Sequence, residues 1–332
     1  MQVLRKLLFP VSLVYGAVVH LRNLLFDLGI LKSETYKIPI ICVGNLSVGG
    51  TGKTPMIELL IRTLGNEKSI AVLSRGYKRK SKGFHLSNPK STITELGDEP
   101  YQIHKKFPDV FVAVDTDRRN GISKLKSLID PKVILLDDAF QHRWVKAGLN
   151  ILLTSYDDLY VDDWFLPTGN LRDAKKEAKR AQLIIVTKCP ENLPKSAADK
   201  IVKKINPDEN QLVLFTKLEY DNNLKGQSEV LDISQLENIQ FTLITGIANP
   251  EPLVAHLKSK KLEFEHLSFK DHHFFTEKEI ENLKRKRLIL TTEKDYVRLN
   301  GQLEKIIYIT VKHTFLFNGQ LTLEKVIHEF MK

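Results

Sequence analysis

The sequence of 332 residues is poor in cysteine, contains no long uninterrupted apolar segment and shows no repeats. Its two cysteines, Cys42 and Cys189, are too few for a disulfide framework, and no CxxC pair indicates a structural zinc site. The apolar runs are shorter than the roughly 20 residues that cross a bilayer, which argues against a polytopic membrane protein. The absence of low-complexity tracts argues against disordered and collagen-like chains.

The composition is that of a soluble globular protein, with 42% hydrophobic and 27% charged residues. Its length is enough for about two domains. The 50 Lys and Arg against 40 Asp and Glu give a net charge of +10, which suits an anionic partner such as phosphorylated substrate, anionic lipid or nucleic acid. Because the basic clusters are short and scattered and no nucleic-acid-binding motif is present, we expect no nucleic-acid partner.

The most apolar segment lies near the N-terminus, at residues 7–26. After Pro10 it predicts an amphipathic helix, with Val14, Val18, Leu21 and Leu25 on one face. Aromatic and basic residues around this face are typical of a helix at a membrane interface. The same pattern fits a helix packed on its own domain, and the sequence leaves both interpretations open.

Apolar, β-branched runs alternate with helical patterns along the rest of the chain, which predicts parallel sheets covered by helices. The predicted strands are 38–43, 69–73, 110–114, 133–136, 151–153, 183–186, 212–215, 241–244, 288–290 and 306–309. Two sets of strands indicate two α/β domains. We expect residues 31–155 to form the first and residues 156–332 a smaller second one, with a return of the C-terminal segment to the first left open.

A glycine-rich loop follows the first predicted strand and precedes a helical pattern, the order that a P-loop requires. Its glycines let backbone N–H groups surround phosphate oxygens, Lys53 neutralises the β- and γ-phosphates, and the Thr54 hydroxyl is suited to Mg²⁺. Ser47 stands where the strict pattern has glycine. The predicted nucleotide-binding residues are Ser47, Val48, Gly49, Gly50, Thr51, Gly52, Lys53 and Thr54.

The predicted strand at 133–136 ends in Asp137 and Asp138, an apolar strand followed by acid. This is the Walker B arrangement, which places a carboxylate beside Mg²⁺. Together with the P-loop it predicts binding of a nucleoside triphosphate.

Other motifs are ambiguous when each is taken alone. Asp98 in Gly97–Pro100 also suits a helix N-cap, residues 167–173 also suit a surface turn, and 292–295 suit a helix cap with ion pairs.

In this order the motifs resemble one family closely, the tetraacyldisaccharide 4'-kinases (LpxK) of lipid A biosynthesis. The matching stretches are GNLSVGGTGKTP (44–55), LSRGY (73–77), GDEP (97–100), DDAFQHR (137–143), LPTGNLRD (166–173), GIANP (246–250), Asp271-His272 and TEKD (292–295). The resemblance implies a P-loop fold and transfer of the ATP γ-phosphate, with Mg²⁺, to the 4'-hydroxyl of tetraacyldisaccharide 1-phosphate, giving lipid IVA.

The resemblance also implies site residues. Asp98 matches the family's proposed catalytic base and His272 its partner, whereas Lys53 and Arg172 match cations that stabilise transferring charge. The matching metal site comprises Thr54, Asp138, Gln141 and Asp173. Candidate substrate residues are Arg75, Arg119, His142 and Asn170. Two departures stand out, because the family usually has Gly at Ala139 and Glu at Asp173.

The resemblance places the protein at the cytoplasmic face of a bacterial inner membrane, with residues 1–30 as a membrane-associating helix. We expect a monomer whose partners are the acylated glucosamine disaccharide 1-phosphate and the membrane surface. The active site should lie between the two domains, with His272 arriving from the second. Two alternatives remain: a nucleotide-switched ATPase or GTPase, and a basic peripheral protein without catalysis.

Overall fold

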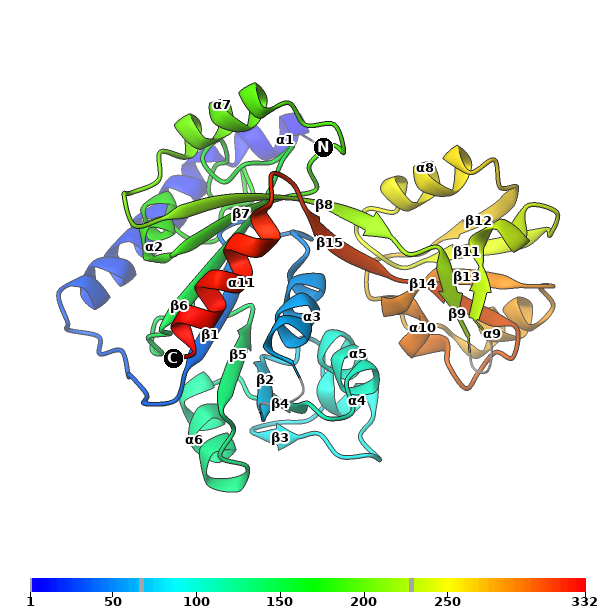
Figure 1. Cartoon of the computed structure of the whole chain (residues 1–332), viewed down its shortest axis with the longest axis horizontal. Coiled ribbons are helices and arrows are strands. Elements are labelled where there is room, and N and C mark those ends of the chain that lie inside the picture. The colour runs from blue at the N-terminus through cyan, green and yellow to red at the C-terminus, as the bar shows by residue number, and fades with distance from the viewer. Residues whose placement is uncertain (1, 66–68, 227–229) are drawn as a thin grey trace.

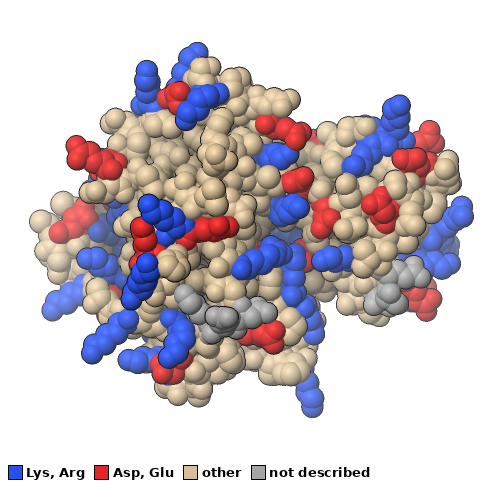
Figure 2. All heavy atoms as spheres, in the orientation of Figure 1, with Lys and Arg blue, Asp and Glu red and all other residues tan. Residues whose placement is uncertain are grey.

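The computed structural model describes residues 2–65, 69–226 and 230–332. Two lobes of unequal size meet at a waist (Figures 1 and 2), and each is built on its own sheet. On the face in Figure 2, basic and acidic side chains are interspersed.

The larger lobe contains a nine-stranded sheet. In spatial order its strands are β15 (Val311–Phe315), β8 (Leu212–Tyr220), β7 (Leu183–Thr187), β6 (Leu149–Ser155), β1 (Ile40–Asn45), β5 (Val133–Asp137), β2 (Ile70–Ser74), β4 (Phe111–Val114) and β3 (His85–Leu86). The strands from β8 to β4 are parallel, and the edge strands β3 and β15 are antiparallel to their neighbours. The predicted α/β class is thus confirmed.

Helices cover both faces of this sheet. Alternate residues of β1 point to opposite sides, so that Ile41 and Val43 pack with one group of helices while Ile40 and Cys42 face the other. The first group is α3 (Lys53–Leu64), α5 (Asp98–Lys106) and α11 (Gly319–Phe330). The second is α6 (Arg118–Leu128), α7 (Lys195–Ile205) and the 3₁₀ helix η1 (Lys175–Arg180). The short helix α4 (Ile93–Leu96) precedes α5.

The smaller lobe contains a six-stranded sheet. Its order is β10 (Val230–Asp232), β9 (Asn223–Lys225), β14 (Ile306–Ile309), β13 (Ile289–Thr292), β11 (Phe241–Thr245) and β12 (Phe264–Ser268). One face packs against α8 (Glu251–Ser259) and the 3₁₀ helix η2 (Ile233–Leu236), and the other against α9 (Glu277–Lys284) and α10 (Glu293–Leu299).

The division between the sheets differs from the division that we expected at residues 155 and 156. Strands β7 and β8 lie beyond residue 156 yet pair in parallel with β6, so the larger sheet continues to residue 220. The chain then builds the smaller sheet and returns through β15 and α11 to the larger lobe. The expected boundary lies too early in the chain because β7 and β8 are parallel strands of the same kind as those before residue 156.

The N-terminal segment forms α1 (Gln2–Leu7) and α2 (Phe9–Asp27), and α2 lies on the larger lobe with its more polar side inward. Ser12, Gly16 and Asn23 are buried, whereas Val14 and Val18 are more than 60% exposed. By length and composition α2 is the one helix among the described residues that could cross a membrane. The inner side of α2 therefore packs against the larger lobe, whereas its apolar outer side is left exposed to solvent.

Candidate active site

The loop between β1 and α3 has the strand–loop–helix geometry predicted for a phosphate-binding loop. Gly52 is the N-cap of α3 in the left-handed conformation, with φ 87°, which an L side chain rarely adopts. Gly49 and Gly50 face open space. Contacts from other segments hold the loop. Val48 N–H donates to the carbonyl of Asn170 (2.8 Å), the Ser47 hydroxyl to Asp163 (3.0 Å), and the Thr187 hydroxyl to the carbonyl of Thr51 (2.9 Å).

Two carboxylates end β5 beside this loop. Asp137 is fully buried; the Ser74 hydroxyl donates to its Oδ2 (3.2 Å), and its Oδ1 has no hydrogen-bond partner within the described chain. Burial, with Glu99 and Asp138 nearby, raises the pKa of Asp137 to about 7. A buried carboxylate oxygen without a partner is the group that a bound cation would satisfy, so the residues present fit a metal ion.

Arg172 links the second carboxylate to the P-loop strand. Its guanidinium contacts both oxygens of Asp138, with Nη1 3.0 Å from Oδ2, and also donates to the side chain of Asn45. Lys53 Nζ lies 3.9 Å from Asp138 Oδ1. Burial disfavours the charged form of Asp138, yet Lys53 and Arg172 hold the pKa of its carboxyl below the usual range. Gln141 donates to the Asn45 carbonyl (2.6 Å), so these side chains converge at the end of β1.

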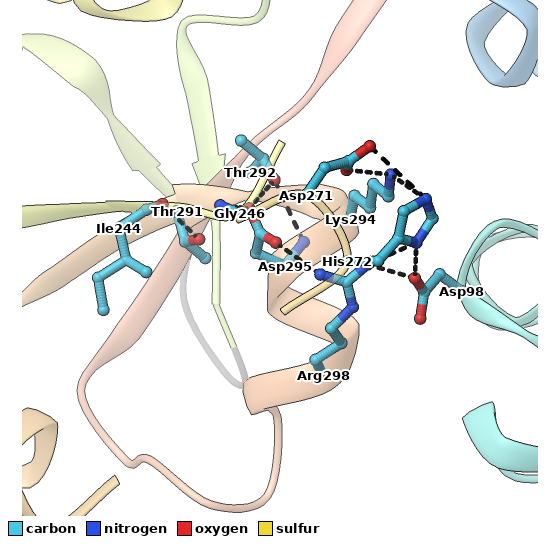
Figure 3. A network of polar contacts seen from close by, with 10 residues as sticks. All are labelled: Asp98, Ile244, Gly246, Asp271, His272, Thr291, Thr292, Lys294, Asp295 and Arg298. Carbon is cyan, nitrogen blue, oxygen red and sulfur yellow. Dashed lines mark hydrogen bonds and ion pairs between the residues drawn. The ribbon is translucent and has the colours of Figure 1, made fainter. Parts of the chain in front are cut away.

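Asp98 and His272 come from different lobes and meet between them (Figure 3). His272 Nδ1 lies 2.5 Å from Asp98 Oδ2, and Arg298 donates to the same oxygen. Burial opposes ionisation of Asp98, but hydrogen bonds from His272 and Arg298 lower its pKa to about 2. The Lys294 ammonium, which can only donate, lies 3.1 Å from His272 Nε2. Arg298 Nη2 lies 3.1 Å from the other ring nitrogen, Nδ1, so a cationic side chain approaches each nitrogen of the imidazole.

The motifs around this pair form its support. Asp295 accepts hydrogen bonds from Gly246 N–H and from the Thr292 hydroxyl, both at 2.8 Å, and ion-pairs with Arg298 at 3.1 Å. These contacts bring together the GIANP and TEKD stretches. Gly97, with φ 87°, lets α5 begin close to the LSRGY turn, since a Cβ there would lie 2.8 Å from the Tyr77 carbonyl.

Sequence reasoning missed Arg298, although it contacts Asp98 directly. The available signal was its position three residues after Asp295, on the same face of a short helix. Glu99 was also missed; it follows Asp98 and acts electrostatically on Asp137. Ala139, where the family usually has Gly, is not a positive-φ position, whereas Asp138 beside it has φ 47°.

Asp173 follows Arg172, and its buried Oδ2, like Oδ1 of Asp137, has no hydrogen-bond partner within the described residues. It is fully buried and accepts a hydrogen bond from Asn23 of α2 at 2.7 Å.

Two of the four candidate substrate residues, Arg119 and His142, lie beside the same carboxylate, Asp117, and the structure does not bring Arg75 and Asn170 into contact with them. Arg119 pairs with Asp117 at 2.9 Å, and His142 lies 3.7 Å from the same carboxyl group. Burial and Arg118 lower the pKa of His142 to about 4. Asn170 accepts a hydrogen bond from Arg5 (2.9 Å). Arg75 is exposed after β2.

A parallel α/β sheet with a phosphate loop, two carboxylates and two cations at the ends of adjacent strands defines a P-loop phosphotransferase. Similarity to known proteins identifies the family. Residues 4–332 match the family model of LpxK, tetraacyldisaccharide-1-P 4'-kinase. The chain therefore belongs to this family of kinases, which phosphorylate the 4' position in lipid A biosynthesis.

Individual relatives agree with the family assignment. The chain is 49% identical to a tetraacyldisaccharide 4'-kinase of Flavobacterium johnsoniae, covering 100% of this chain and 98% of the relative. It is 47% identical to that of Bacteroides thetaiotaomicron, covering 89% and 83%. A crystal structure of LpxK from Aquifex aeolicus in complex with ATP matches with a TM-score of 0.81 and 32% identity, covering 99% and 100% of the two chains.

Proposed function

We propose that this protein transfers the γ-phosphoryl group of ATP to the 4'-hydroxyl of a tetraacylated glucosamine disaccharide 1-phosphate, forming lipid IVA. The observation that carries the mechanism is the Asp98–His272 pair, which brings a carboxylate and an imidazole from two lobes together. A sugar hydroxyl needs a group that accepts its proton, and this pair can supply one. An ATPase that switches a protein partner has no sugar hydroxyl to deprotonate.

The P-loop backbone and Lys53 bind the triphosphate in this proposal. Backbone N–H groups at the open Gly49–Gly50 turn and the N-terminus of α3 attract phosphate oxygens. Arg172, held by Asp138 and Asn45, stabilises negative charge on the transferring group.

Thr54, Asp137 and Asp138 are the residues that would hold Mg²⁺, and Gln141 orients the adjacent backbone of Asn45. Bound Mg²⁺ would supply charge neutralisation at the phosphates. No group of three or more His, Cys, Asp or Glu gathers as a metal cage in the described ranges. This suits Mg²⁺, which is usually bound by one or two carboxylates together with substrate phosphates. Asp173 stays a candidate ligand, because its Oδ1 contacts α2 while its buried Oδ2 has no hydrogen-bond partner among the described residues.

Asp98 accepts the proton of the 4'-hydroxyl. Its Oδ2 is occupied by His272 and Arg298, which leaves Oδ1 outside the network for the sugar (Figure 3). With a pKa of about 2, Asp98 is ionised throughout the physiological range but is a weak base. A weak base is sufficient where the transition state is loose and little bonding to the nucleophile has formed.

The exposed apolar side of α2 binds the cytoplasmic surface of the inner membrane, where the acylated substrate resides. Phe9 and Trp164, whose rings are 5.4 Å apart, extend this surface to the loop that carries Arg172. Arg75, Arg119, His142 and Asn170 remain our candidates for contacts with the disaccharide phosphate, and the protein acts as a monomer.

The test is transfer of label from γ-labelled Mg-ATP to purified tetraacyldisaccharide 1-phosphate in detergent micelles. Wild type, Asp98→Asn and the exposed control Asp109→Asn are compared. We expect Asp98→Asn to lower kcat by about 10²- to 10⁴-fold, the range for loss of a general base, while the control retains activity. No labelled lipid with wild type, but ATP hydrolysis stimulated by a protein partner, would favour the switch ATPase instead.

A further inference from the structure

Strands β8 and β15 connect the two lobes as a two-stranded ribbon (Figure 1). Strand β8 pairs with β7 as far as Phe215, and from Thr216 to Tyr220 it pairs with β15. The chain leaves the larger lobe along β8 and returns along β15. Any displacement of the smaller lobe must therefore act on this ribbon.

His313 lies within the ribbon and packs against the phosphate loop. Its side chain is buried, and its ring lies so close to Gly52 that a Cβ at that glycine would be 2.9 Å from Cε1 and Nε2. Nε2 is 2.9 Å from the carbonyl oxygen of Gly52, and Nδ1 is 2.9 Å from the hydroxyl of Thr216 on β8.

The protonation of His313 follows from these partners. A carbonyl can only accept, so Nε2 carries the proton and donates to Gly52. Nδ1 then accepts from the Thr216 hydroxyl. Burial lowers the pKa of His313 to about 4, which agrees with a neutral ring.

The Gly52 carbonyl belongs to the same planar peptide as the N–H of Lys53, and in a trans peptide the two groups point in opposite directions. Lys53 is the first residue of α3, so its N–H has no partner within the helix. The Gly52 carbonyl accepts from Met56 N–H of α3 (3.1 Å) and, from outside the helix, from His313. Donors that fix this carbonyl also fix the direction of the Lys53 N–H available to phosphate, and His313 is the donor that comes from the ribbon.

We propose that His313 is a positioning residue for nucleotide binding: it holds the Gly52–Lys53 peptide in the phosphate-binding orientation and joins this peptide to the ribbon between the lobes. Among the motifs that carry the family resemblance none includes His313. The inference rests on the proposed nucleotide site and goes beyond it, because His313 touches no expected ligand atom.

The experiment measures Mg-ATP affinity by titration calorimetry without lipid, together with KM for ATP and kcat in the transfer assay. His313→Leu removes the donor, and His313→Gln retains an amide N–H at similar reach. Lys312→Ala is the matched control, since Lys312 is the exposed neighbour on the same strand. We expect His313→Leu to weaken ATP binding and raise KM by about 10-fold or more, as for a lost buried hydrogen bond. His313→Gln and Lys312→Ala should stay within about threefold of wild type.

Wild-type affinity in a folded His313→Leu variant would overturn the inference, as would equal weakening by Leu and Gln, which would assign the effect to ring packing. If His313→Leu does not fold, His313→Asn replaces it, because its shorter amide falls short of the Gly52 carbonyl. Equal affinities of the Asn and Gln variants would then overturn the proposal. Absence of ATP binding by wild type would overturn the proposed nucleotide site itself, which distinguishes the two failures.

Discussion

Asp137 is a single residue whose charge lowers the stability of the ligand-free protein at neutral and higher pH. Its pKa of about 7 lies above the ordinary value of 3.8, so the folded protein binds this proton more tightly than the unfolded chain. The associated stability is complete below the unfolded pKa and is lost as the pH rises through 7. At pH 8 the protein therefore contains a buried, charged carboxylate with one oxygen unpaired.

We predict that Asp137→Asn raises the melting temperature of the ligand-free protein at pH 8 while abolishing phosphate transfer. The gain should be several degrees at pH 8, at roughly 2–4 °C per kcal/mol for a chain of this size, and smaller at pH 5. Thermal melts at the two pH values measure it. A loss of stability that is equal at both values would show that the charge is not the cause.

Arg298 acts through charge on Asp98, the base that we propose. With His272 it holds the pKa of Asp98 near 2 against the effect of burial, so ionised Asp98 contributes stability above the unfolded pKa that is lost as the pH falls through about 2. We predict that Arg298→Gln raises this pKa and lowers kcat more at pH 5 than at pH 8.

A pH–rate profile tests the prediction for Arg298, and the control is Arg285→Gln, at an exposed position after α9. The result that counts against it is a profile for Arg298→Gln that parallels the wild-type profile.

Sequence reasoning could find the residues that stand in local motifs and not those defined by tertiary contact. Lys53 has a local signal, the glycine-rich turn. Asp98 taken alone also suits a helix N-cap, and only the family resemblance proposes it as a base. Arg298 reaches Asp98 across 200 residues of sequence, so only the fold shows its role.

At the scale of elements, every predicted strand is present, and the strands that were not predicted are short or lie at the edge of a sheet. Strands β1 and β5 are buried along their whole length and give continuous apolar runs. β12 is half-exposed throughout, and β9 and β10 have three residues each. β15 contains Lys312 and the buried His313, a pattern that does not indicate a strand. The pairing of such short or edge strands depends on the neighbouring strands, which the local sequence does not specify.

Helix α2 has a polar side that faces the protein and an apolar side that is exposed. Its polar residues contact the protein, since Ser12 donates to Thr168 (2.8 Å) and Asn23 to Asp173 (2.7 Å). Val18 and Leu21 are exposed by 62% and 58%. The two interpretations that the sequence left open, packing on its own lobe and binding to a membrane, are therefore compatible on opposite sides of one helix.

We predict that Val18→Glu/Leu21→Glu weakens binding to phosphatidylglycerol-containing vesicles at least about 10-fold, because each apolar side chain buried in lipid contributes up to about 1.5–3 kcal/mol. The fold should be unchanged, and the activity on a micellar short-chain substrate should fall less than the activity on vesicles. Leu321→Glu, an equally exposed position on α11, is the control. Vesicle binding equal to wild type would remove α2 from the membrane surface.

For the whole molecule, the position of the boundary between the lobes is the feature that the sequence could least predict. The strands on either side of residue 156 have the same apolar pattern, so composition marks no boundary there. The boundary is defined by the ribbon and by α5, whose ends both contact α10 or its neighbours. Asp98 at the start of α5 binds His272, and Lys106 at its end binds Glu293 of α10.

Lys106 connects the lobes at the end of α5, in addition to the ribbon and the Asp98–His272 contact. Its Nζ lies 2.8 Å from Glu58 of α3 and 2.7 Å from Glu293 of α10, and all three side chains are largely buried. Burial and the nearby Glu58 raise the pKa of Glu293, with Lys106 opposing them. Without Lys106, two buried carboxylates would face each other across the lobe boundary, with Arg62 and Gln102 contacting Glu58.

We predict that Lys106→Met loosens the smaller lobe and lowers kcat, although Lys106 contacts neither nucleotide nor sugar. Removing one partner of a buried ion pair costs about 3–5 kcal/mol, because the remaining charge is uncompensated. The raised pKa of Glu293 means that this penalty is small below the unfolded pKa and grows as the pH rises, so the loss of melting temperature should be larger at pH 8 than at pH 5.

The double variant Lys106→Met/Glu293→Gln separates the charge effect from lost packing. It removes the uncompensated charge together with its partner, so it should recover much of the melting temperature and kcat that Lys106→Met loses. Hydrogen exchange along α5 gives a direct reading of lobe closure, with faster exchange expected in the single variant than in the double. If the double variant were as impaired as the single, the connection would depend on the shape of the lysine side chain, and charge would not govern how the lobes close around Asp98.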